Sequence, residues 1–254
     1  MLTCCYNFSY FPENFEVFEK SSDIIIRDFN FMSGLSIVNA LLALIFFKAC
    51  PQELIATVFS GDFIKRLQQE IEMCYSKNTY PQRVMKQVMQ LNRAVCLDCP
   101  EVNVKWFQQS FMEAQALKPA RVHSRLFKDV HNTLLSIVQK PEHLLSGRIT
   151  PYGYRIDFEL NLDQYNRFVI PPPDDYSNPT FMPNVNKIAI LLLSNRMLCN
   201  NDYNRLRGSE ILRMRHLEMM GYRVVHIKIT DFNSLYRNLT TKIKYLKNLL
   251  QLTA

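Results

Sequence analysis

The spacing of hydrophobic positions changes along this chain, from a helical period to a β-type pattern. Over residues 15–145, apolar side chains recur every three or four positions, for example at Leu35, Val38, Leu42 and Ile45. This period places them on one face of an α-helix. Prolines fall between the periodic segments, at helix starts or in loops, where a missing backbone donor is harmless. The first part of the chain is therefore predicted to be a stack of short helices.

A β-type pattern follows. Residues 154–160 alternate between apolar and polar side chains, and residues 187–193 form an almost unbroken aliphatic run. The alternation predicts a half-buried strand, and the aliphatic run predicts a strand buried on both faces. Residues 213–220 return to helical spacing, Gly221 closes that helix, and residues 222–227 are again rich in β-forming side chains. The order strand, strand, helix, strand predicts a small α/β domain behind the helical stack, so the fold class is α+β.

The segment of residues 35–47 is the only candidate for a membrane span. It contains Ser36 and Asn39 and ends at Lys48, and it is shorter than the roughly 20 apolar residues that a spanning helix needs. We expect a helix buried inside the protein and no membrane span.

A long connection separates the two predicted strands. Residues 163–186 include the run Pro171-Pro172-Pro173 and two further prolines, which do not suit a regular element. This segment is predicted to be an excursion between strands, either a tolerated surface insertion or a lid or interaction surface.

Positive charge is concentrated in the later part of the sequence. The chain has a net charge of +7, and residues 205–247 alone hold ten Lys and Arg against three Asp and Glu. The remaining residues are therefore close to neutral. A basic field confined to one segment favours a polyanionic partner such as nucleic acid, and a solvated helix face is the alternative.

The cysteines do not indicate a metal centre. Seven of them lie at irregular spacings, which favours a reducing compartment over secretion. Only Cys96 and Cys99 have the spacing of metal ligands, and no second close pair of ligands follows them. We expect structural thiols.

Three groups of residues resemble domains of one known family, the FAST-kinase-domain proteins. Residues 154–160, 188–193, 208–210 and 216–227 look like a RAP domain, a short RNA-associated module. Upstream, residues 91–100 with Trp106-Phe107 resemble the second FAST domain, and residues 23–67 are similar to the end of the first. The resemblance divides the chain into residues 1–70 (FAST_1-like), 71–147 (FAST_2-like) and 148–254 (RAP domain).

This resemblance implies a location and a role. Members of the family reside in the mitochondrial matrix and act on mitochondrial transcripts, affecting RNA processing, mRNA stability and translation, often in ribonucleoprotein granules. The chain starts without a transit peptide, so we expect its natural N-terminus to lie further upstream. Kinase activity is not expected, because the chain has no glycine-rich loop and no HRD or DFG segment.

The RAP domain also resembles a restriction-endonuclease-like sheet of the PD-(D/E)xK type. In that fold an Asp and a Glu on neighbouring strands hold Mg²⁺. Asp157 fits the first position, but Ile190, Leu191, Leu192 and Leu193 occupy the strand where the Glu and Lys should lie. Glu159 could substitute, because residues two apart on a strand share a face. With so degenerate a centre we expect a binding module that needs no cofactor, and Mg²⁺-dependent endoribonuclease activity is the alternative.

The RNA-binding hypothesis depends on cations and aromatic rings of the basic segment. Ile211, Met214, Leu217 and Met220 are expected to form the inward stripe of a helix, leaving its arginines nearer solvent. Arginine and lysine can bind phosphates, and tyrosines can stack on unpaired bases. The predicted RNA-binding residues are Arg205, Arg207, Arg213, Arg215, Arg223, Lys242, Lys244, Tyr203 and Tyr222, and Tyr236 also lies among these charges.

A third function class remains open at this point. Stacked helices often present long concave surfaces to other proteins, so a protein-interaction scaffold of a mitochondrial RNA granule is the second alternative. Salt-dependent binding of single-stranded RNA would distinguish an RNA-binding module from such a scaffold.

Overall fold

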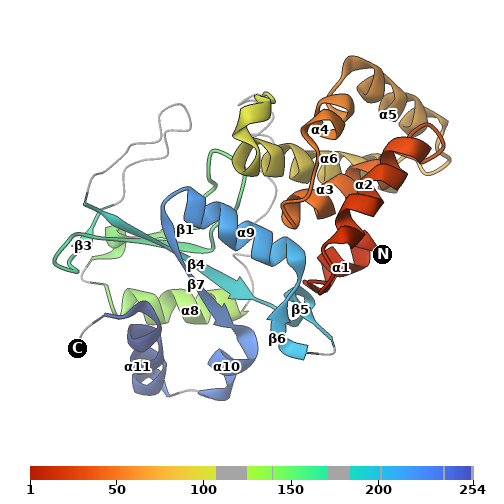
Figure 1. Cartoon of the computed structure of the whole chain (residues 1–254). Coiled ribbons are helices and arrows are strands. Elements are labelled where there is room, and N and C mark those ends of the chain that lie inside the picture. The colour runs from red at the N-terminus through yellow and green to blue at the C-terminus, as the bar shows by residue number, and fades with distance from the viewer. Residues whose placement is uncertain (107–124, 139, 171–183, 201, 237, 253–254) are drawn as a thin grey trace. The chain divides into compact units, whose positions relative to one another are not determined.

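The computed structural model of the chain describes residues 1–106, 125–138, 140–170, 184–200, 202–236 and 238–252. The chain divides into two compact units, and neither is continuous in sequence. The helical unit comprises Met1–Trp106 and Asn204–Leu212, and the sheet unit comprises Phe107–Tyr203 and Arg213–Ala254. Helices come first and a small sheet follows, so the predicted α+β class is confirmed (Figure 1).

The helical unit is built around one buried helix. Its elements are α1 (Leu2–Asn7), α2 (Glu16–Asp28), α3 (Gly34–Phe46), α4 (Gln52–Val58), α5 (Gly61–Met73), α6 (Thr79–Asp98) and the 3₁₀ turn η1 (Pro100–Val102). Eleven of the 13 residues of α3 are buried, which confirms the buried helix expected at residues 35–47. No helix in the described part of the chain is long and apolar enough to cross a lipid bilayer.

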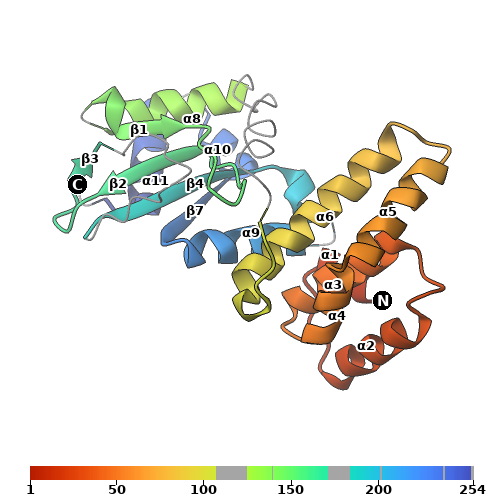
Figure 2. The same cartoon turned by 90° about the horizontal axis from the view of Figure 1, so that it is seen from above.

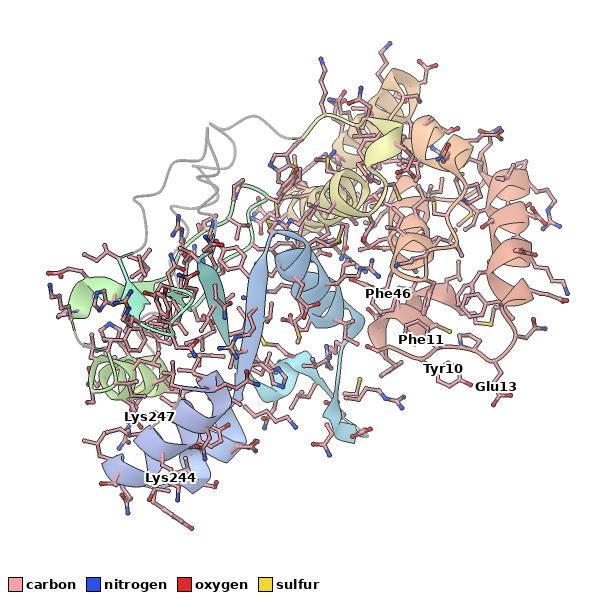
Figure 3. The ribbon with its side chains drawn as sticks, turned by 60° about the vertical axis from the view of Figure 1, so that its left-hand side comes forward. Tyr10, Phe11, Glu13, Phe46, Lys244 and Lys247 are labelled. Atoms are coloured by element: carbon pink, nitrogen blue, oxygen red, sulfur yellow. The ribbon has the colours of Figure 1, made fainter. Side chains whose placement is uncertain are left out.

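Helix α3 is fixed at both ends. At its start the Ser33 hydroxyl accepts a hydrogen bond from the Ser36 N–H, and the Gly34 N–H donates to the carboxylate of Glu70 on α5 at 2.9 Å. Such contacts satisfy amides that have no partner within the helix. At its end Phe46 lies against Phe11, with ring centroids 5.8 Å apart (Figure 3). The aromatic residues of the N-terminal segment therefore close the core of this unit.

A segment from much later in the sequence completes the helical unit. The Ser9 hydroxyl donates to the carbonyl oxygen of Leu206 at 2.5 Å, and Leu212 is buried in the core of the unit. Gly208 lies so close to Tyr6 that a Cβ atom at position 208 would be 2.0 Å from the Tyr6 carbonyl oxygen. The division between the units therefore runs through helix α9 (Gly208–Met219).

The described residues of the sheet unit form a mixed sheet with helices packed against it. Its elements are α8 (Arg125–Leu135), η3 (Pro141–His143), β1 (Leu144–Ser146), β2 (Phe158–Leu162), β3 (Phe168–Val169), β4 (Asn186–Leu193), η4 (Asn195–Met197), β5 (Leu198–Cys199), the start of β6 (Asp202–Leu206), the later part of α9, β7 (Tyr222–Lys228), α10 (Ile229–Ser234) and α11 (Leu239–Leu250). The strand order is β1-β2-β4-β7, with β3 paired to β2. Strands β1, β2 and β4 are antiparallel neighbours, whereas β4 and β7 run parallel. Strands β5 and β6 form a separate two-stranded sheet.

The two faces of the mixed sheet differ in chemistry. Phe158 and Leu160 of β2 and Ile190 of β4 pack with side chains of α8, α10 and α11 in one apolar core. The alternate residues of β2, Glu159 and Asn161, belong to the opposite face because side chains alternate along a strand, and both are buried. The later part of α9 lies on that face (Figure 2). A buried polar layer therefore separates the sheet from α9.

The element predictions are confirmed where the pattern is long. The strand expected at residues 187–193 is β4, the helix closed by Gly221 is α9, and the strand after it is β7. Gly221 has a φ of +83°, as expected for a glycine that ends a helix. The expected inward stripe of α9 is only partly correct, because the buried residues of this helix are Gly208, Leu212, His216 and Leu217.

Short elements differ from the predictions. The first predicted strand begins at Phe158 rather than at residue 154, and Arg155 forms only an isolated bridge with Ile149. Strand β3 falls inside the expected excursion of residues 163–186, and residues 171–183 of that excursion lie outside the described part. A strand of two residues is too short to produce a periodic pattern, which explains why β3 was missed.

Candidate nucleic-acid interface

Asp157 lies where the chain enters strand β2. Its side chain is half-buried, and its Oδ2 accepts a hydrogen bond from the backbone N–H of Leu192 on β4 at 2.8 Å. Strand β4 is therefore the neighbouring strand that the sequence predicts. Beside Asp157 it carries leucines, whose side chains cannot bind a metal ion. In this structure the carboxylate of Asp157 anchors one strand to the next.

Glu159 is held more tightly. Its side chain is 1% exposed, its Oε1 lies 2.9 Å from Nη1 of Arg148, and its Oε2 accepts a hydrogen bond from the Tyr222 hydroxyl at 3.3 Å. A buried carboxylate needs such partners because transfer of a lone charge out of water is costly. Both oxygens that would bind a cation are occupied by protein groups.

These two acids do not form a complete metal site. Among the described residues, no group of three or more His, Cys, Asp and Glu side chains could hold a metal ion. Asp129 of α8 pairs with Lys242, with Oδ2 and Nζ 2.6 Å apart. Because Arg148 and Tyr222 bind the carboxylate oxygens of Glu159, the donor set around Asp157 and Glu159 does not fit Mg²⁺.

At least three of the predicted RNA-binding cations contact the protein itself. Lys242 is buried. Its ammonium group forms an ion pair with Asp129, and its nitrogen lies 4.9 Å from the ring centroid of Phe232. Arg213 donates from Nη2 to the carbonyl oxygen of Arg155. Such contacts position helices α9 and α11, so charge reversal at these positions would also reduce the stability of the fold.

Arg223 is the third. Its guanidinium donates to the carbonyl oxygen of Leu250 at 2.6 Å and to Oε1 of Gln251 at 3.2 Å, and burial lowers the pKa of Arg223. These bonds hold the end of α11 against strand β7. RNA contact by Arg213, Arg223 and Lys242 stays a prediction, and the structure gives each of them a structural partner.

Other predicted cations face solvent. Arg205 and Arg207 are exposed and belong to the helical unit, whereas Lys244 on α11 is exposed and belongs to the sheet unit. Lys247 lies one turn after Lys244 on the same helix (Figure 3). Arg215 on α9 is half-buried. The basic segment is thus divided between two units of the chain.

Of the two tyrosines predicted to bind RNA, Tyr222 has a described side chain. Tyr222 is half-buried, its hydroxyl binds Glu159, and its ring centroid lies 6.0 Å from the ammonium nitrogen of Lys187. These contacts give Tyr222 a place in the polar layer under α9. The side chain of Tyr203 lies outside the described part of the structure.

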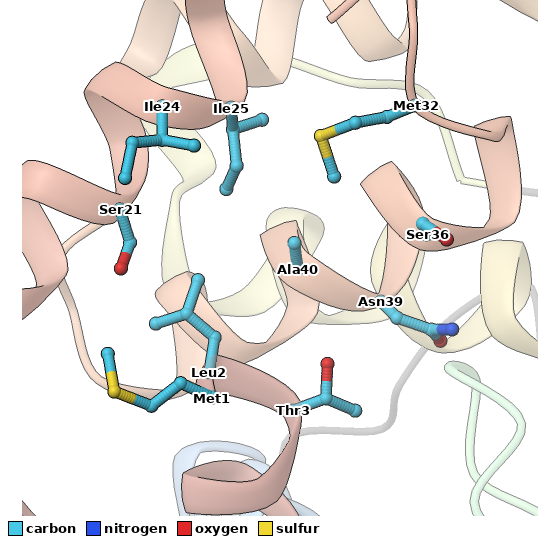
Figure 4. A pocket seen from close by; sticks show the side chains of 10 residues that line it. All are labelled: Met1, Leu2, Thr3, Ser21, Ile24, Ile25, Met32, Ser36, Asn39 and Ala40. Carbon is cyan, nitrogen blue, oxygen red and sulfur yellow. The ribbon is translucent and has the colours of Figure 1, made fainter. Parts of the chain in front are cut away.

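Described residues also line two cavities that the sequence did not predict. One, of about 400 Å³, lies in the helical unit between α1, α2 and α3 and is lined by residues such as Ile24, Met32 and Ala40 (Figure 4). The other, of about 380 Å³, lies in the sheet unit and combines residues of α8 with residues of α10 and α11. Tyr236 lines the second cavity, and its position among basic residues was the only sequence signal for it.

Comparison with known domain families gives three matches. Residues 1–68 match subdomain 1 of FAST kinase-like proteins, residues 85–171 match subdomain 2, and residues 194–249 match the RAP domain. Asp157 and Glu159 therefore fall within the subdomain 2 match, although the sequence interpretation began the RAP domain at residue 148. Strands from both matches, β2 and β7, contribute to one sheet.

Similar proteins carry the same family name. FAST kinase domain-containing protein 1, mitochondrial, from Mus musculus is 31% identical over 198 residues, which cover 73% of this chain and 24% of that protein. FAST kinase domain-containing protein 3, mitochondrial, from Homo sapiens is 26% identical over 235 residues, or 89% of this chain and 33% of that protein. The chain thus spans a quarter to a third of these relatives. With both FAST subdomains and a RAP domain in the predicted order, the chain belongs to the family of FAST kinase domain-containing proteins.

Proposed function

We propose that this protein binds single-stranded or structured RNA in the mitochondrial matrix and thereby acts in the processing, stability or translation of mitochondrial transcripts. One observation carries the proposal: the RAP match at residues 194–249 coincides with the basic segment at residues 205–247. The relatives named above are mitochondrial proteins by their names, which supports the location.

The solvent-facing cations are the best candidates for first contact with RNA. Arg205, Arg207 and Lys244 are exposed, so phosphates of an RNA strand in solvent can reach them. Phosphate neutralisation releases counterions and is independent of sequence. These side chains would therefore contribute to the affinity for RNA, and other features of the protein would determine which transcript is bound.

We further propose that the sheet unit is related to restriction-endonuclease-like folds. Its mixed sheet with helices on both faces and the acid at the entrance of β2 support this relation. Cleavage of RNA is the less favoured function, because Glu159 is bound by Arg148 and Tyr222. Service as a scaffold for granule proteins is the remaining alternative, and no contact among the described residues favours it.

The test is a titration of fluorescent single-stranded RNA at several salt concentrations. For the double variant Lys244→Glu and Lys247→Glu we expect weaker binding, because two phosphate contacts are replaced by repulsion. Loss of two contacts on a single strand should also reduce the slope of log K against log[salt] by about 1.4. Fluorescence anisotropy measures both quantities.

A matched control separates local contact from overall charge. Lys65 on α5 and Lys86 on α6 are exposed lysines of the helical unit, and their conversion to Glu changes the net charge by the same amount. We expect the control to bind RNA more tightly than the Lys244/Lys247 variant. Equal weakening in both variants would mean that net charge, rather than local contact, causes the effect. If the unmodified chain does not bind RNA at low salt, the protein-interaction scaffold is the function that remains. Mg²⁺-dependent cleavage that Asp157→Ala abolishes would instead support the nuclease.

A further inference from the structure

The cavity of the sheet unit has an unusual lining for its size. About 380 Å³ in volume, it is bordered by Arg125, Leu126 and Asp129 of α8, by Asn233 and Lys242 of α10 and α11, and by Tyr236 between these two helices. We call it the Tyr236 pocket. Its volume is near the lower end of ligand sites, which span roughly 300–1,000 Å³. A small polar group or a single nucleotide would fill it.

Lys242 places a cation in the wall of the pocket. Its side chain is 7% exposed, and its ammonium group is 2.6 Å from Oδ2 of Asp129. An ammonium group has three donors, and Asp129 is its hydrogen-bond acceptor among the described residues. The cation is therefore held in place and still able to donate to a ligand.

The remaining polar groups of the pocket have no partner within the described part of the chain. Arg125, Asn233 and Tyr236 are exposed, and their side chains make no hydrogen bond or ion pair with other described residues. Tyr236 is 83% exposed. Its backbone has a φ of 51°, and its N–H donates to the carbonyl oxygen of Asn233 at 3.1 Å. This bond ties Tyr236 to the end of α10 beside the pocket.

This combination matches the chemistry of one unpaired nucleotide. An exposed aromatic ring offers a surface on which a base stacks, and an amide can donate to and accept from a base edge. Arg125 and Lys242 supply two positive charges against one negative charge on Asp129, which leaves a single net charge. A phosphodiester within a strand carries one negative charge, whereas a terminal phosphate carries more.

We propose that the Tyr236 pocket receives one unpaired nucleotide of single-stranded RNA, with the base on Tyr236 and its phosphodiester on Arg125 and Lys242. The inference rests on the proposed RNA-binding function and adds to it a defined site for a base. Cations on the surface of α11 would bind the phosphates of the RNA strand, and the Tyr236 pocket would hold one of its nucleotides.

The test compares four forms of the full chain in binding to fluorescent oligouridine. Tyr236→Ala should weaken binding roughly fivefold to a hundredfold, the range expected for loss of one stacked base. Tyr236→Phe keeps the ring and should stay within about twofold of the unmodified chain. Tyr165→Ala removes another exposed tyrosine of the same unit, 68% exposed, and should have no effect. Thermal unfolding checks that all four forms are folded.

The outcomes distinguish this inference from the proposed function. If all four forms bind RNA equally, the pocket is not a base site although the protein binds RNA. If none binds RNA, the proposed function fails and the inference fails with it. If uridine monophosphate competes as well as the RNA strand, the pocket is a site for free nucleotides and the inference is overturned.

A second readout does not depend on affinity. RNA that contains 5-iodouridine should crosslink on irradiation to the peptide with Tyr236, and the crosslink should disappear in Tyr236→Ala. Crosslinks confined to peptides without Tyr236, Arg125 or Lys242 would contradict the proposal.

Discussion

Glu159 illustrates how far a single residue can be interpreted from sequence. Its spacing from Asp157 predicts that the two acids share one face of a strand, and in the structure Asp157 lies just before β2 whereas Glu159 lies within it. Its partners, however, are 11 residues away at Arg148 and 63 residues away at Tyr222. No local pattern connects positions so far apart. The sequence therefore indicates a candidate ligand, and the three-dimensional structure reveals a carboxylate already bound by its own protein.

Replacement of Arg148 should test this arrangement. Arg148→Met would leave the carboxylate of Glu159 buried without its cation, so we expect the free energy of unfolding to fall by about 3 kcal/mol. Urea denaturation followed by circular dichroism measures the change.

Two further variants give this prediction its controls. Addition of Glu159→Gln to Arg148→Met removes the unpaired charge and should restore most of the lost stability. Arg167→Met breaks an ion pair with Asp163 in which the Arg167 side chain is 70% exposed, and it should cost less than about 1 kcal/mol. If Arg148→Met costs no more than Arg167→Met, the buried pair does not contribute as proposed.

At the scale of elements, length decides what the sequence predicts. Strands β4 and β7 have eight and seven residues, enough for a recognisable pattern, and both were predicted. Strands β1 and β3 have three and two residues and exist because β2 offers them hydrogen-bonding partners. Elements of this kind depend on their neighbours rather than on their own side chains, so sequence alone does not show them.

The start of α9 offers a test at the same scale. A Cβ atom at Gly208 would lie 2.0 Å from the Tyr6 carbonyl oxygen and 2.8 Å from its ring. Gly208→Ala should therefore force α1 and the start of α9 apart and lower the free energy of unfolding by about 1–3 kcal/mol. Chemical denaturation of the full chain provides the measurement.

Gly61 is the matched control for this substitution. It is also the first residue of a helix, α5, and nothing lies within 4 Å of a Cβ atom added there. Gly61→Ala should leave the stability unchanged or raise it slightly. An equal loss in both variants would mean that the contact with Tyr6 is unimportant.

At the scale of the whole molecule, the sequence correctly predicts the class, the family and the helical character of the first part. It does not predict which residues belong to which unit. The basic segment looks uniform in sequence, yet Arg205 and Lys244 belong to different units, because long-range packing rather than composition assigns each residue to a core.

The RAP match should not fold by itself. Residues 194–254 contain β7 but lack β2 and β4, and β7 pairs with β4 alone within the described sheet. A fragment of residues 194–254 should therefore show little regular β-structure by circular dichroism and no cooperative thermal transition, whereas the full chain should show both. Cooperative unfolding of the fragment would contradict the shared sheet.

The return of residues 204–212 to the helical unit affects how the protein is made. During synthesis α1 to α6 leave the ribosome before the sheet unit does, but the strand and helix start that contact Tyr6 and Ser9 follow only after most of the sheet unit has been translated. Contacts between such distant positions form slowly, because a large loop must close before they are made. Until these contacts form, part of the apolar surface of the helices is exposed to water, and such exposure makes a nascent chain prone to aggregation and a substrate for chaperones.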